Sequence, residues 1–515
     1  MLSSLSSTLC DHFFQCLYGY SGSLSEKIFF LHLSKHFYLG SMVFSSIVFI
    51  FYFLPLFFLV YFLADKRYKN AVILCGSIFF YSWGAPQFIF VILGTTVIDF
   101  YVVRLMSQTT SKAPRQLLLC LSLCINLSLL VYFKYSNFFV ENINVLFHHF
   151  GIKTLSWTKL VLPIGISFYT FETLTYVVDV YRGVHKPLKN FWDYQLYIIL
   201  FPKLIAGPII RFHEFADQIY DHINNESTEL RLRGLYRFFI GLAKKVLIAN
   251  VLGVTAEVVF DFQPGQLSTS AAWFGALNYT FQIYYDFSGY SDMAIGLGLM
   301  MGFRFPENFN NPYTAVSITD FWRRWHITLG AWMRNYLYIP LGGNRVNSKM
   351  RLYFNLWLVF LASGLWHGAA WGFIIWGAYH GLFLVLERLF LGKWLAKLGK
   401  ASVIYTFTVV LVGWVFFRTE QLHNALAYLH SMFTWQPDKS FWQPNRENVV
   451  MLCMAIFFSF FTLTSWGDRI HQKIFYSDYS LKLHFTMTFA TILLLIICAG
   501  RITVSTFNPF IYFRF

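Results

Sequence analysis

Long apolar runs follow one another along almost the whole chain, with only short polar interruptions between them. The first reads VFSSIVFIFYFLPLFFLVYFLA from Val43 and stops at Asp65. A helix needs about 20 apolar residues to cross roughly 30 Å of hydrocarbon. Helices that enter or cross a membrane are therefore expected in these runs: residues 42–63, 71–84, 87–106, 116–134, 157–180, 192–210, 234–260, 271–300, 352–364, 366–391, 402–418, 448–466 and 483–500.

Composition supports this interpretation. Of the 515 residues, 57% are hydrophobic and 13% are charged, whereas an ordinary soluble domain carries about 25% charged residues. This excludes a soluble multidomain enzyme. We predict an all-α, polytopic membrane protein with about 11–12 transmembrane helices, because some of the runs are too short or too interrupted to span.

The formal net charge is +15. In a soluble protein this surplus would suggest nucleic acid, but in a membrane protein Lys and Arg gather in cytoplasmic loops and against anionic headgroups. We therefore expect membrane lipids as partners and no nucleic acid, and the surplus leaves room for a basic cytoplasmic vestibule. The basic clusters at 66–69 and 104–115 are separated by two apolar runs, which puts both on the cytoplasmic side.

The chain shows no repeat and no separate soluble domain. We expect residues 1–41 to form an N-terminal extension outside the fold and residues 42–515 to form one membrane-embedded domain. Cys120 and Cys124 lie one helical turn apart, but no further ligands lie nearby. The seven scattered cysteines therefore predict neither a disulfide framework nor a metal site.

Polar side chains inside apolar sequence are costly, so each is a candidate for function. Glu172 and Asp179 lie two helical turns apart in LPIGISFYTFETLTYVVDVYRG. The stretch FPKLIAGPIIRFHEF carries two prolines that would break a helix, with Lys203, Arg211 and His213 beside the break. Structural roles remain open for both stretches: carboxylates bonded to a neighbouring helix, and a loop at the membrane interface.

A third polar stretch is YTFQIYYDFSGYSDMAIGLGLMMG. Gln282, Asp286 and Tyr290 recur every four residues and so share one helical face, and Asp292 adds a further carboxylate. A structural polar seam between helices is the alternative interpretation. Gly296 and the glycines near it suit close helix packing rather than nucleotide binding, because no strand precedes them.

The fourth stretch, SITDFWRRWHITLGAWMRNYLYIPLGGNR, mixes arginines with aromatic residues, as an amphipathic segment in the membrane interface would. It contains a Trp-His pair ending at His326. A second Trp-His pair ends at His367, 41 residues later, in SGLWHGAAWGFIIWGAYHG. A lone histidine in an apolar helix is usually a packing residue, but the glycines beside His367 give another backbone or a ligand close access to it.

The sequence contains no HExxH, P-loop, paired CxxC or GxSxG element. Zinc hydrolysis, ATP-driven transport and serine-hydrolase chemistry therefore lose their usual support. An imidazole can take a proton from a hydroxyl while the oxygen attacks an activated carbonyl. Acyl transfer suits these residues, although composition alone does not select it.

Together these stretches resemble the membrane-bound O-acyltransferase (MBOAT) family, in its bacterial branch of alginate O-acetylation proteins. The segments that carry the resemblance are FPKLIAGPIIRF, FQIYYDFSGYSDMAIGLGLMMGFRFPENFN, DFWRRWHITLGAWMRNYLYIPLGGNR, SGLWHGAAWGFIIWGAYHG, VGWVFFRTE and the terminal NPFIYFRF. The resemblance extends from about residue 42 to residue 515. It implies a helical bundle with re-entrant and interfacial helices around a central tunnel.

The resemblance also implies roles for residues. His367 corresponds to the deep catalytic histidine, a general base, and His326 to a second essential or donor-positioning group. The supporting residues it implies are Asp286, Tyr290, Trp325 and Trp366 along the tunnel, and Arg323, Arg324 and Arg334 at the anionic part of the donor.

In the family branch, a cytoplasmic acetyl donor delivers its acetyl group through the membrane, and a periplasmic acetyltransferase partner places it on a polysaccharide hydroxyl. We therefore expect a multi-pass protein of the bacterial inner membrane, with acetyl-CoA as the donor substrate, no permanently bound cofactor and a polysaccharide such as alginate as acceptor. Whether transfer is direct or passes through the partner is left open.

Two alternatives remain. A transporter or channel also uses intramembrane carboxylates, broken helices and histidines, although such folds often show internal duplication and none is visible here. Within the acyltransferase class, the acceptor could be peptidoglycan, O-antigen or teichoic acid.

Overall fold

A computed structural model describes residues 42–262, 266–437, 444–504 and 510–511. The chain divides into two units, Met1–Met42 and Val43–Phe515, and the second is the one described below. The predicted extension at residues 1–41 lies outside the described residues.

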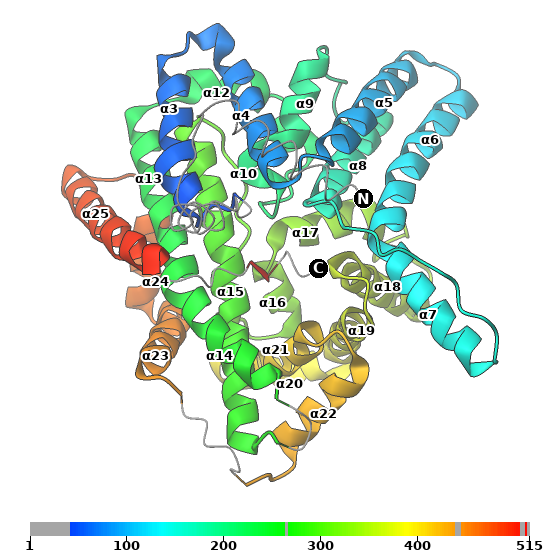
Figure 1. Ribbon diagram of the computed structural model, residues 1–515, viewed down its shortest axis with the longest axis vertical. Helices are drawn as coiled ribbons and strands as arrows, with labels where there is room; N and C mark the ends of the chain where they lie inside the picture. The colour runs from blue at the N-terminus through cyan, green and yellow to red at the C-terminus, as the bar shows by residue number, and fades with distance from the viewer. Residues whose placement is uncertain (1–41, 263–265, 438–443, 505–509, 512–515) are drawn as a thin grey trace, which may run out of the picture. The chain divides into compact units, whose positions relative to one another are not determined.

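The described part of the chain is helical, and it contains no β-strand beyond a single bridge between Phe309 and Trp325. Figure 1 shows the α-helices: α3 (Leu54–Leu63), α4 (Lys69–Gly84), α5 (Ile89–Gln108), α6 (Lys112–Leu130), α7 (Ser136–His149), α8 (Ile166–Arg182), α9 (Phe191–Ile199), α10 (Phe201–Leu204), α11 (Phe212–Phe215), α12 (Gln218–Asn225), α13 (Thr228–Ala243), α14 (Asn250–Phe260), α15 (Thr269–Met300), α16 (Ile318–Arg324), α17 (Ile327–Trp332), α18 (Lys349–His367), α19 (Trp371–Leu386), α20 (Gly392–Leu398), α21 (Ser402–Arg418), α22 (Leu422–Phe433), α23 (Arg446–Phe460), α24 (Ser465–Phe475) and α25 (Leu481–Val504).

Five π-helical segments extend or join these helices, and four short 3₁₀ turns connect others. The π-helical segments are η1 (Val48–Phe53), η3 (Val131–Tyr135), η4 (Lys244–Ala249), η6 (Met333–Tyr338) and η7 (Glu387–Leu391), and the 3₁₀ turns are η2 (Lys66–Tyr68), η5 (Pro312–Thr314), η8 (Gly399–Ala401) and η9 (Phe461–Leu463). The all-α prediction is confirmed.

Six helical stretches of the described chain are long and apolar enough to cross a membrane: Ile89–Gln108, Lys112–His149, Thr228–Phe260, Trp371–Arg418, Arg446–Leu463 and Leu481–Val504. The protein is therefore a multi-pass membrane protein. Val48–Leu63 is also apolar but shorter. The 48-residue stretch Trp371–Arg418 contains three α-helices, α19, α20 and α21. The expected number of 11–12 crossings stays a prediction.

Helix α15 is packed tightly along α13, and the two lie side by side in Figure 1, with α13 on the left. Glycines let the two backbones meet: a Cβ at Gly296 would lie 2.5 Å from the carbonyl oxygen of Gly234, and one at Gly241 would lie 2.5 Å from that of Gly289. Only residues without a side chain permit this approach. The packing role predicted for Gly296 is thus confirmed.

Two of the expected helical runs are interrupted. In the run 157–180, regular helix begins only at Ile166, because Pro163 precedes it and Gly165 is left-handed (φ 76°). In the run 192–210, α9 ends at Ile199 and only the four-residue α10 follows, so the break predicted from the two prolines is confirmed.

Candidate active site

The two histidines of the Trp-His pairs meet inside the protein. The centroids of the His326 and His367 rings lie 6.3 Å apart. Both residues are buried, with exposed fractions of 1% and 4%. They reach this position from different elements, since His326 lies between α16 and α17 and His367 is the last residue of α18. Chain folding therefore brings together the pair that the sequence predicted to be catalytic.

His326 is held in an unusual backbone conformation. Its φ of 45° is left-handed, which costs a residue other than glycine roughly 1–2 kcal/mol. Strain of this kind persists only where the surroundings fix it, and it is common at functional sites. Here an adjacent strand-like pairing fixes it: the amide of Asn310 donates to the carbonyl of Arg324 (2.9 Å), and that of Ile327 to the carbonyl of Asn308 (3.0 Å).

The side chain of Asn308 orients the His326 ring. Its Oδ1 accepts from His326 Nδ1 (3.0 Å) and from the Thr328 hydroxyl (2.9 Å), and its Nδ2 donates to Ser291 Oγ (3.0 Å). This arrangement places the proton of a neutral imidazole on Nδ1. His326 Nε2 is then the acceptor nitrogen, and it has no hydrogen-bond partner among the described residues.

His367 lies in a wall of aromatic rings at the end of α18. Its ring centroid is 5.1 Å from those of Trp376 on α19 and Phe417 on α21. The sequence predicted that the glycines beside His367 would admit either another backbone or a ligand. In the structure they admit another helix, α19. A Cβ at Gly364 would lie 2.3 Å from the carbonyl oxygen of Phe373, and one at Gly368 would lie 2.1 Å from its ring.

Of the two predicted tunnel tryptophans, Trp366 lies beside both histidines, whereas Trp325 packs against other aromatic rings. The Trp366 ring is 5.0 Å from that of His367 and 5.9 Å from that of His326, so it contacts both. Trp325 is buried against Trp414 (4.9 Å between ring centroids). Trp366 is buried and so helps to exclude water from the space around the imidazoles.

Asp286 and Tyr290 lie on α15 and contact the C-terminal residues of the chain. Asp286 forms a buried ion pair with Lys245 (2.7 Å) and accepts from the backbone amide of Ile511 (2.9 Å). Tyr290 stacks on Phe510, with 4.8 Å between ring centroids. Their expected role beside the histidines stays a prediction.

The three candidate donor-binding arginines differ in their surroundings. Arg324 is half-buried and forms an ion pair with Asp320 (3.0 Å). Arg323 and Arg334 are exposed. These two are therefore the ones accessible to an anionic substrate.

The polar residues of the first two stretches pair with each other. Glu172 and Asp179 both lie on α8, and each meets a residue from the broken segment. Lys203 forms a buried ion pair with Glu172, and His213 Nδ1 lies 2.8 Å from Asp179. Removing one partner of such a buried pair would leave an uncompensated charge. The structural alternative, a carboxylate bonded to a neighbouring segment, therefore describes these contacts.

A cavity of about 460 Å³ lies where α14, α15, α21 and α22 meet. Carboxylates, an arginine, amides and aromatic rings line it, including Glu257, Asp261, Gln282, Arg418, Glu420, Asn424 and Tyr428. Two of the residues that line this cavity are linked to candidate site residues. Arg418 follows Phe417, which packs on His367, and Ile511, another lining residue, donates to Asp286.

Several residues at the site were not predicted. Asn308 lies in the stretch FRFPENFN, but nothing in a single sequence marks it as the partner of a histidine 18 residues further on. Lys134 bonds the end of α18 from the distant segment η3. A signal did exist for Lys134, because it is a charged residue at the end of the apolar run 116–134.

Comparison with known proteins shows which family the chain resembles. Residues 184–419, which include both histidines, match the model of the membrane-bound O-acyltransferase family. A probable alginate O-acetylase of Pseudomonas putida is 42% identical over 493 residues, which cover 92% of this chain and 100% of that protein.

Two further relatives cover most of the chain. A probable alginate O-acetylase of Pseudomonas aeruginosa is 47% identical over 435 residues, 83% of this chain and 82% of the relative. A peptidoglycan O-acetyltransferase of Helicobacter pylori is 40% identical over 427 residues, 76% of this chain and 80% of the relative. With its helical membrane fold and its buried pair of histidines, this chain belongs to the membrane-bound O-acyltransferase family.

Proposed function

We propose that the protein passes an acetyl group from acetyl-CoA, on the cytoplasmic side of the bacterial inner membrane, to a hydroxyl of a cell-envelope or extracellular polysaccharide such as alginate. The meeting of His326 and His367 inside the protein, with ring centroids 6.3 Å apart, carries this proposal. The relatives named as alginate O-acetylases support the acetyl group and the acceptor.

Charge distribution supports the direction of transfer. The basic segment that includes Lys69 is cytoplasmic by the positive-inside rule. Lys69 forms an ion pair with Glu226 (2.6 Å), next to the start of the 33-residue helical stretch Thr228–Phe260. Such a stretch is about 50 Å long. Its far end, where Glu257 and Asp261 line the cavity, then lies on the extracytoplasmic side.

In the proposed reaction His367 is the general base. It takes the proton of the attacking hydroxyl while the oxygen forms a bond to the thioester carbonyl carbon. The C–S bond breaks as the tetrahedral intermediate collapses, and the proton passes to the leaving thiolate. His326, with its proton held on Nδ1 by Asn308, presents Nε2 toward the same buried space. Arg323 and Arg334 contact the anionic part of the donor.

A periplasmic acetyltransferase partner completes the transfer in this proposal. The charged donor then never crosses the membrane: the acetyl group leaves the sulfur of coenzyme A as an ester on the attacking hydroxyl, and the partner transfers it from that ester to the polymer hydroxyl. The cavity near Arg418 is where the acetyl group leaves the protein.

Peptidoglycan is the second candidate acceptor, because the Helicobacter pylori relative named as a peptidoglycan O-acetyltransferase is 40% identical over 76% of this chain. Both acceptors offer sugar hydroxyls, so the chemistry at the histidines is the same.

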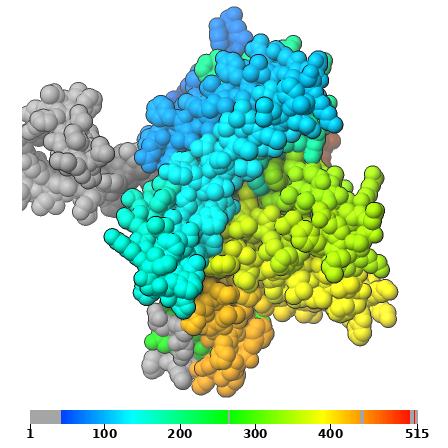
Figure 2. Space-filling model, turned by 90° about the vertical axis from the view of Figure 1, so that its right-hand side faces the viewer, coloured from blue at the N-terminus to red at the C-terminus, as the bar shows by residue number. Residues whose placement is uncertain are grey.

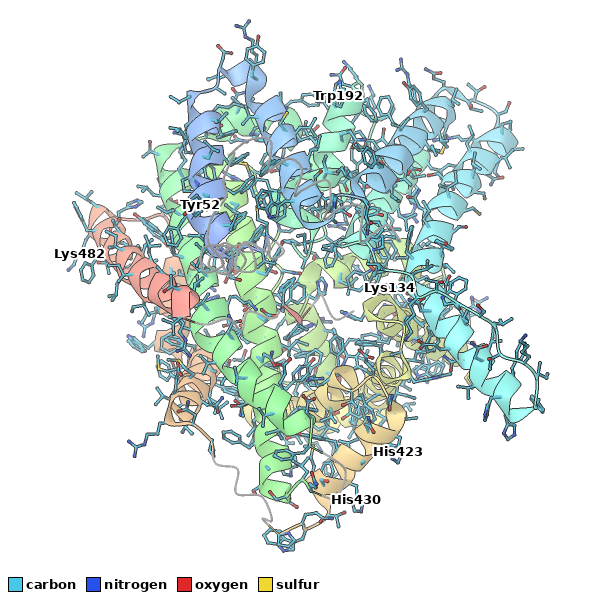
Figure 3. The ribbon with its side chains drawn as sticks, viewed as in Figure 1. Tyr52, Lys134, Trp192, His423, His430 and Lys482 are labelled. Carbon is cyan, nitrogen blue, oxygen red and sulfur yellow. The ribbon has the colours of Figure 1, made fainter. Side chains whose placement is uncertain are left out.

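The test is complementation of a bacterial strain whose alginate O-acetylase gene has been deleted. Base-labile acetate is measured in secreted alginate and in purified peptidoglycan. The wild-type chain is expected to restore alginate acetate, and His367→Gln to abolish it at equal abundance in the membrane. His430→Gln is the matched control, since His430 is exposed on α22 (Figure 3). Acetate in peptidoglycan alone would favour the second acceptor, and full acetylation by His367→Gln would refute the role of His367.

A further inference from the structure

Helix α18 ends at His367, and two consecutive side chains from a distant part of the chain meet its last three carbonyl groups. The Tyr135 hydroxyl donates to the carbonyl of Leu365 (2.7 Å). The Lys134 ammonium donates to the carbonyls of Trp366 (2.5 Å) and His367 (3.1 Å). The last carbonyls of a helix have no partner within that helix. Residues 134 and 135 therefore complete the helix end that carries His367.

Lys134 reaches α18 from the π-helical segment η3, between α6 and α7. Single π-helical turns inside longer helices are rare and are frequent at functional sites. Figure 3 shows Lys134 at the junction of α6 and α7, beside α18. In Figure 2 the cyan surface of α6 and α7 runs alongside the yellow-green surface that includes α18.

The contacts of Lys134 are those of a satisfied cation. The side chain is buried, and its third contact is Ser167 Oγ on α8, at 3.1 Å. An ammonium group has three N–H donors, and each has an acceptor here. The partial negative charge at a helix C-terminus also favours a cation. The three acceptors of Lys134 all belong to the protein itself, which suits a residue that positions other groups.

Two features of the active site depend on this contact. Trp366, whose carbonyl Lys134 holds, touches the rings of both histidines, with centroids 5.0 Å and 5.9 Å away. His367, whose carbonyl Lys134 also holds, carries the imidazole itself. A displacement of about 1 Å at a reacting group can lower a rate about 100-fold.

We propose that Lys134 is a positioning residue for acyl transfer: it clamps the C-terminal end of α18 and thereby fixes the His367 imidazole relative to His326. Tyr135 assists by holding the preceding turn. This inference rests on the proposed role of His367 as general base.

The test measures acetyl transfer from acetyl-CoA in inverted membrane vesicles that carry the full chain. Lys134→Met is expected to lower kcat about 10- to 100-fold and to leave the KM for acetyl-CoA within about twofold. Lys134→Arg keeps a cation that can donate to several carbonyls, and it is expected to retain about tenfold more activity than Lys134→Met. Lys112→Met, at an exposed position of α6, is the matched control and is expected to behave as wild type.

A purely structural role gives a different result. Lys134→Met would then lower the amount of folded protein and leave kcat per folded molecule at the wild-type value. An unchanged kcat in Lys134→Met would refute the proposal. If Lys134→Met does not accumulate in the membrane, Tyr135→Phe decides, because it removes only one hydroxyl. It is expected to lower kcat several-fold, and an unchanged kcat would overturn the clamp.

The failure of this proposal can be told apart from failure of the proposed function. If His367→Gln is inactive and Lys134→Met is fully active, only the clamp is wrong. If His367→Gln is active, the role of His367 is wrong. If wild-type vesicles release no coenzyme A from acetyl-CoA, acetyl-CoA is not the donor. The activities of Lys134→Met and Lys134→Arg are then compared by measuring polymer acetate in the complemented strain.

Discussion

Asn308 holds the imidazole of His326 in one orientation and one protonation pattern, and a substitution can test how much this matters. Asn308→Ala removes the acceptor for Nδ1 and for the Thr328 hydroxyl, so the ring is free to rotate. We expect polymer acetylation to fall about 100-fold at normal membrane abundance. Asn310→Ala, at an exposed neighbouring position, is the control. Acetylation by Asn308→Ala at the wild-type level would mean that the orientation of His326 is unimportant.

At the residue scale, the sequence predicted the two histidines and their tryptophans. The histidines were marked both as polar groups inside apolar sequence and by the family resemblance, whereas the roles of the tryptophans came from the resemblance alone. It could not predict Asn308 or Lys134 as their partners, since a hydrogen bond across 18 or 233 residues depends on how the elements pack. The same limit applies to Asp286, whose contact with Ile511 joins residues far apart in the chain.

Helices α18 and α19 form a close pair, and this contact can be tested at Gly364. A Cβ at this position would lie 2.3 Å from the carbonyl oxygen of Phe373, which cannot move independently of α19. We expect Gly364→Ala to destabilise the protein by about 1–3 kcal/mol and to lower its melting temperature in detergent. Gly84→Ala is the matched control, because a Cβ at Gly84 would have no atom within 4 Å of it. Equal melting temperatures for the two variants would contradict this packing.

The amphipathic segment around α16 and α17 carries the exposed arginines Arg323 and Arg334. If they contact the anionic part of the donor, Arg323→Gln and Arg334→Gln should each raise the KM for acetyl-CoA about tenfold, since a charge-assisted hydrogen bond contributes about 1.5–3 kcal/mol. Initial rates in inverted vesicles measure this, with Arg351→Gln at an exposed position of α18 as the control. An unchanged KM in both variants would remove these arginines from the donor site.

At the element scale, breaks in the helices were easier to predict than their lengths. The prolines near residue 200 marked a break that the structure contains. The expected helix at 157–180 begins later, at Ile166, because an apolar composition does not distinguish a helix from an apolar loop. The π-helical segment that places Lys134 leaves no signal in hydrophobic periodicity either.

At the scale of the whole molecule, a buried charge cluster joins the ends of several elements. Glu226 accepts from Lys69 (2.6 Å), from Arg231 (2.5 Å) and from the hydroxyl of Tyr61 (2.5 Å). Burial alone would raise the pKa of Glu226, but the hydrogen bonds from Lys69, Tyr61 and Arg231 hold the pKa below its usual value.

A carboxylate with a lowered pKa in the folded state stabilises the protein at neutral pH, and this contribution is lost as the pH falls through the folded-state pKa. The loss therefore begins below about pH 4.3, the usual pKa of Glu. We expect the melting temperature of the detergent-solubilised protein to fall more steeply between pH 5 and pH 3 in wild type than in Glu226→Gln. Parallel curves would show that Glu226 does not contribute to acid sensitivity.

The number of membrane crossings is the whole-molecule property that the sequence determines least. Thirteen apolar runs led to an expectation of 11–12 spans. In the described part of the chain, six helical stretches are both long enough and apolar enough to cross a membrane. The difference arises because α15, which is 32 residues long, is lined with polar residues, and because α4 and α8 are too short. Of these, α8 and α15 are buried along almost their whole length and contribute to the interior of the protein.

The proposed function requires His367 for acetyl transfer from the cytoplasmic side to a polymer on the other side. The most direct test uses inverted membrane vesicles that carry the protein. The vesicles enclose alginate and the periplasmic acetyltransferase partner, and acetyl-labelled acetyl-CoA is added outside. Label should accumulate in the enclosed polymer with the wild-type chain and should stay at background with His367→Gln. Equal labelling of the polymer with both proteins would show that His367 is not required for the transfer.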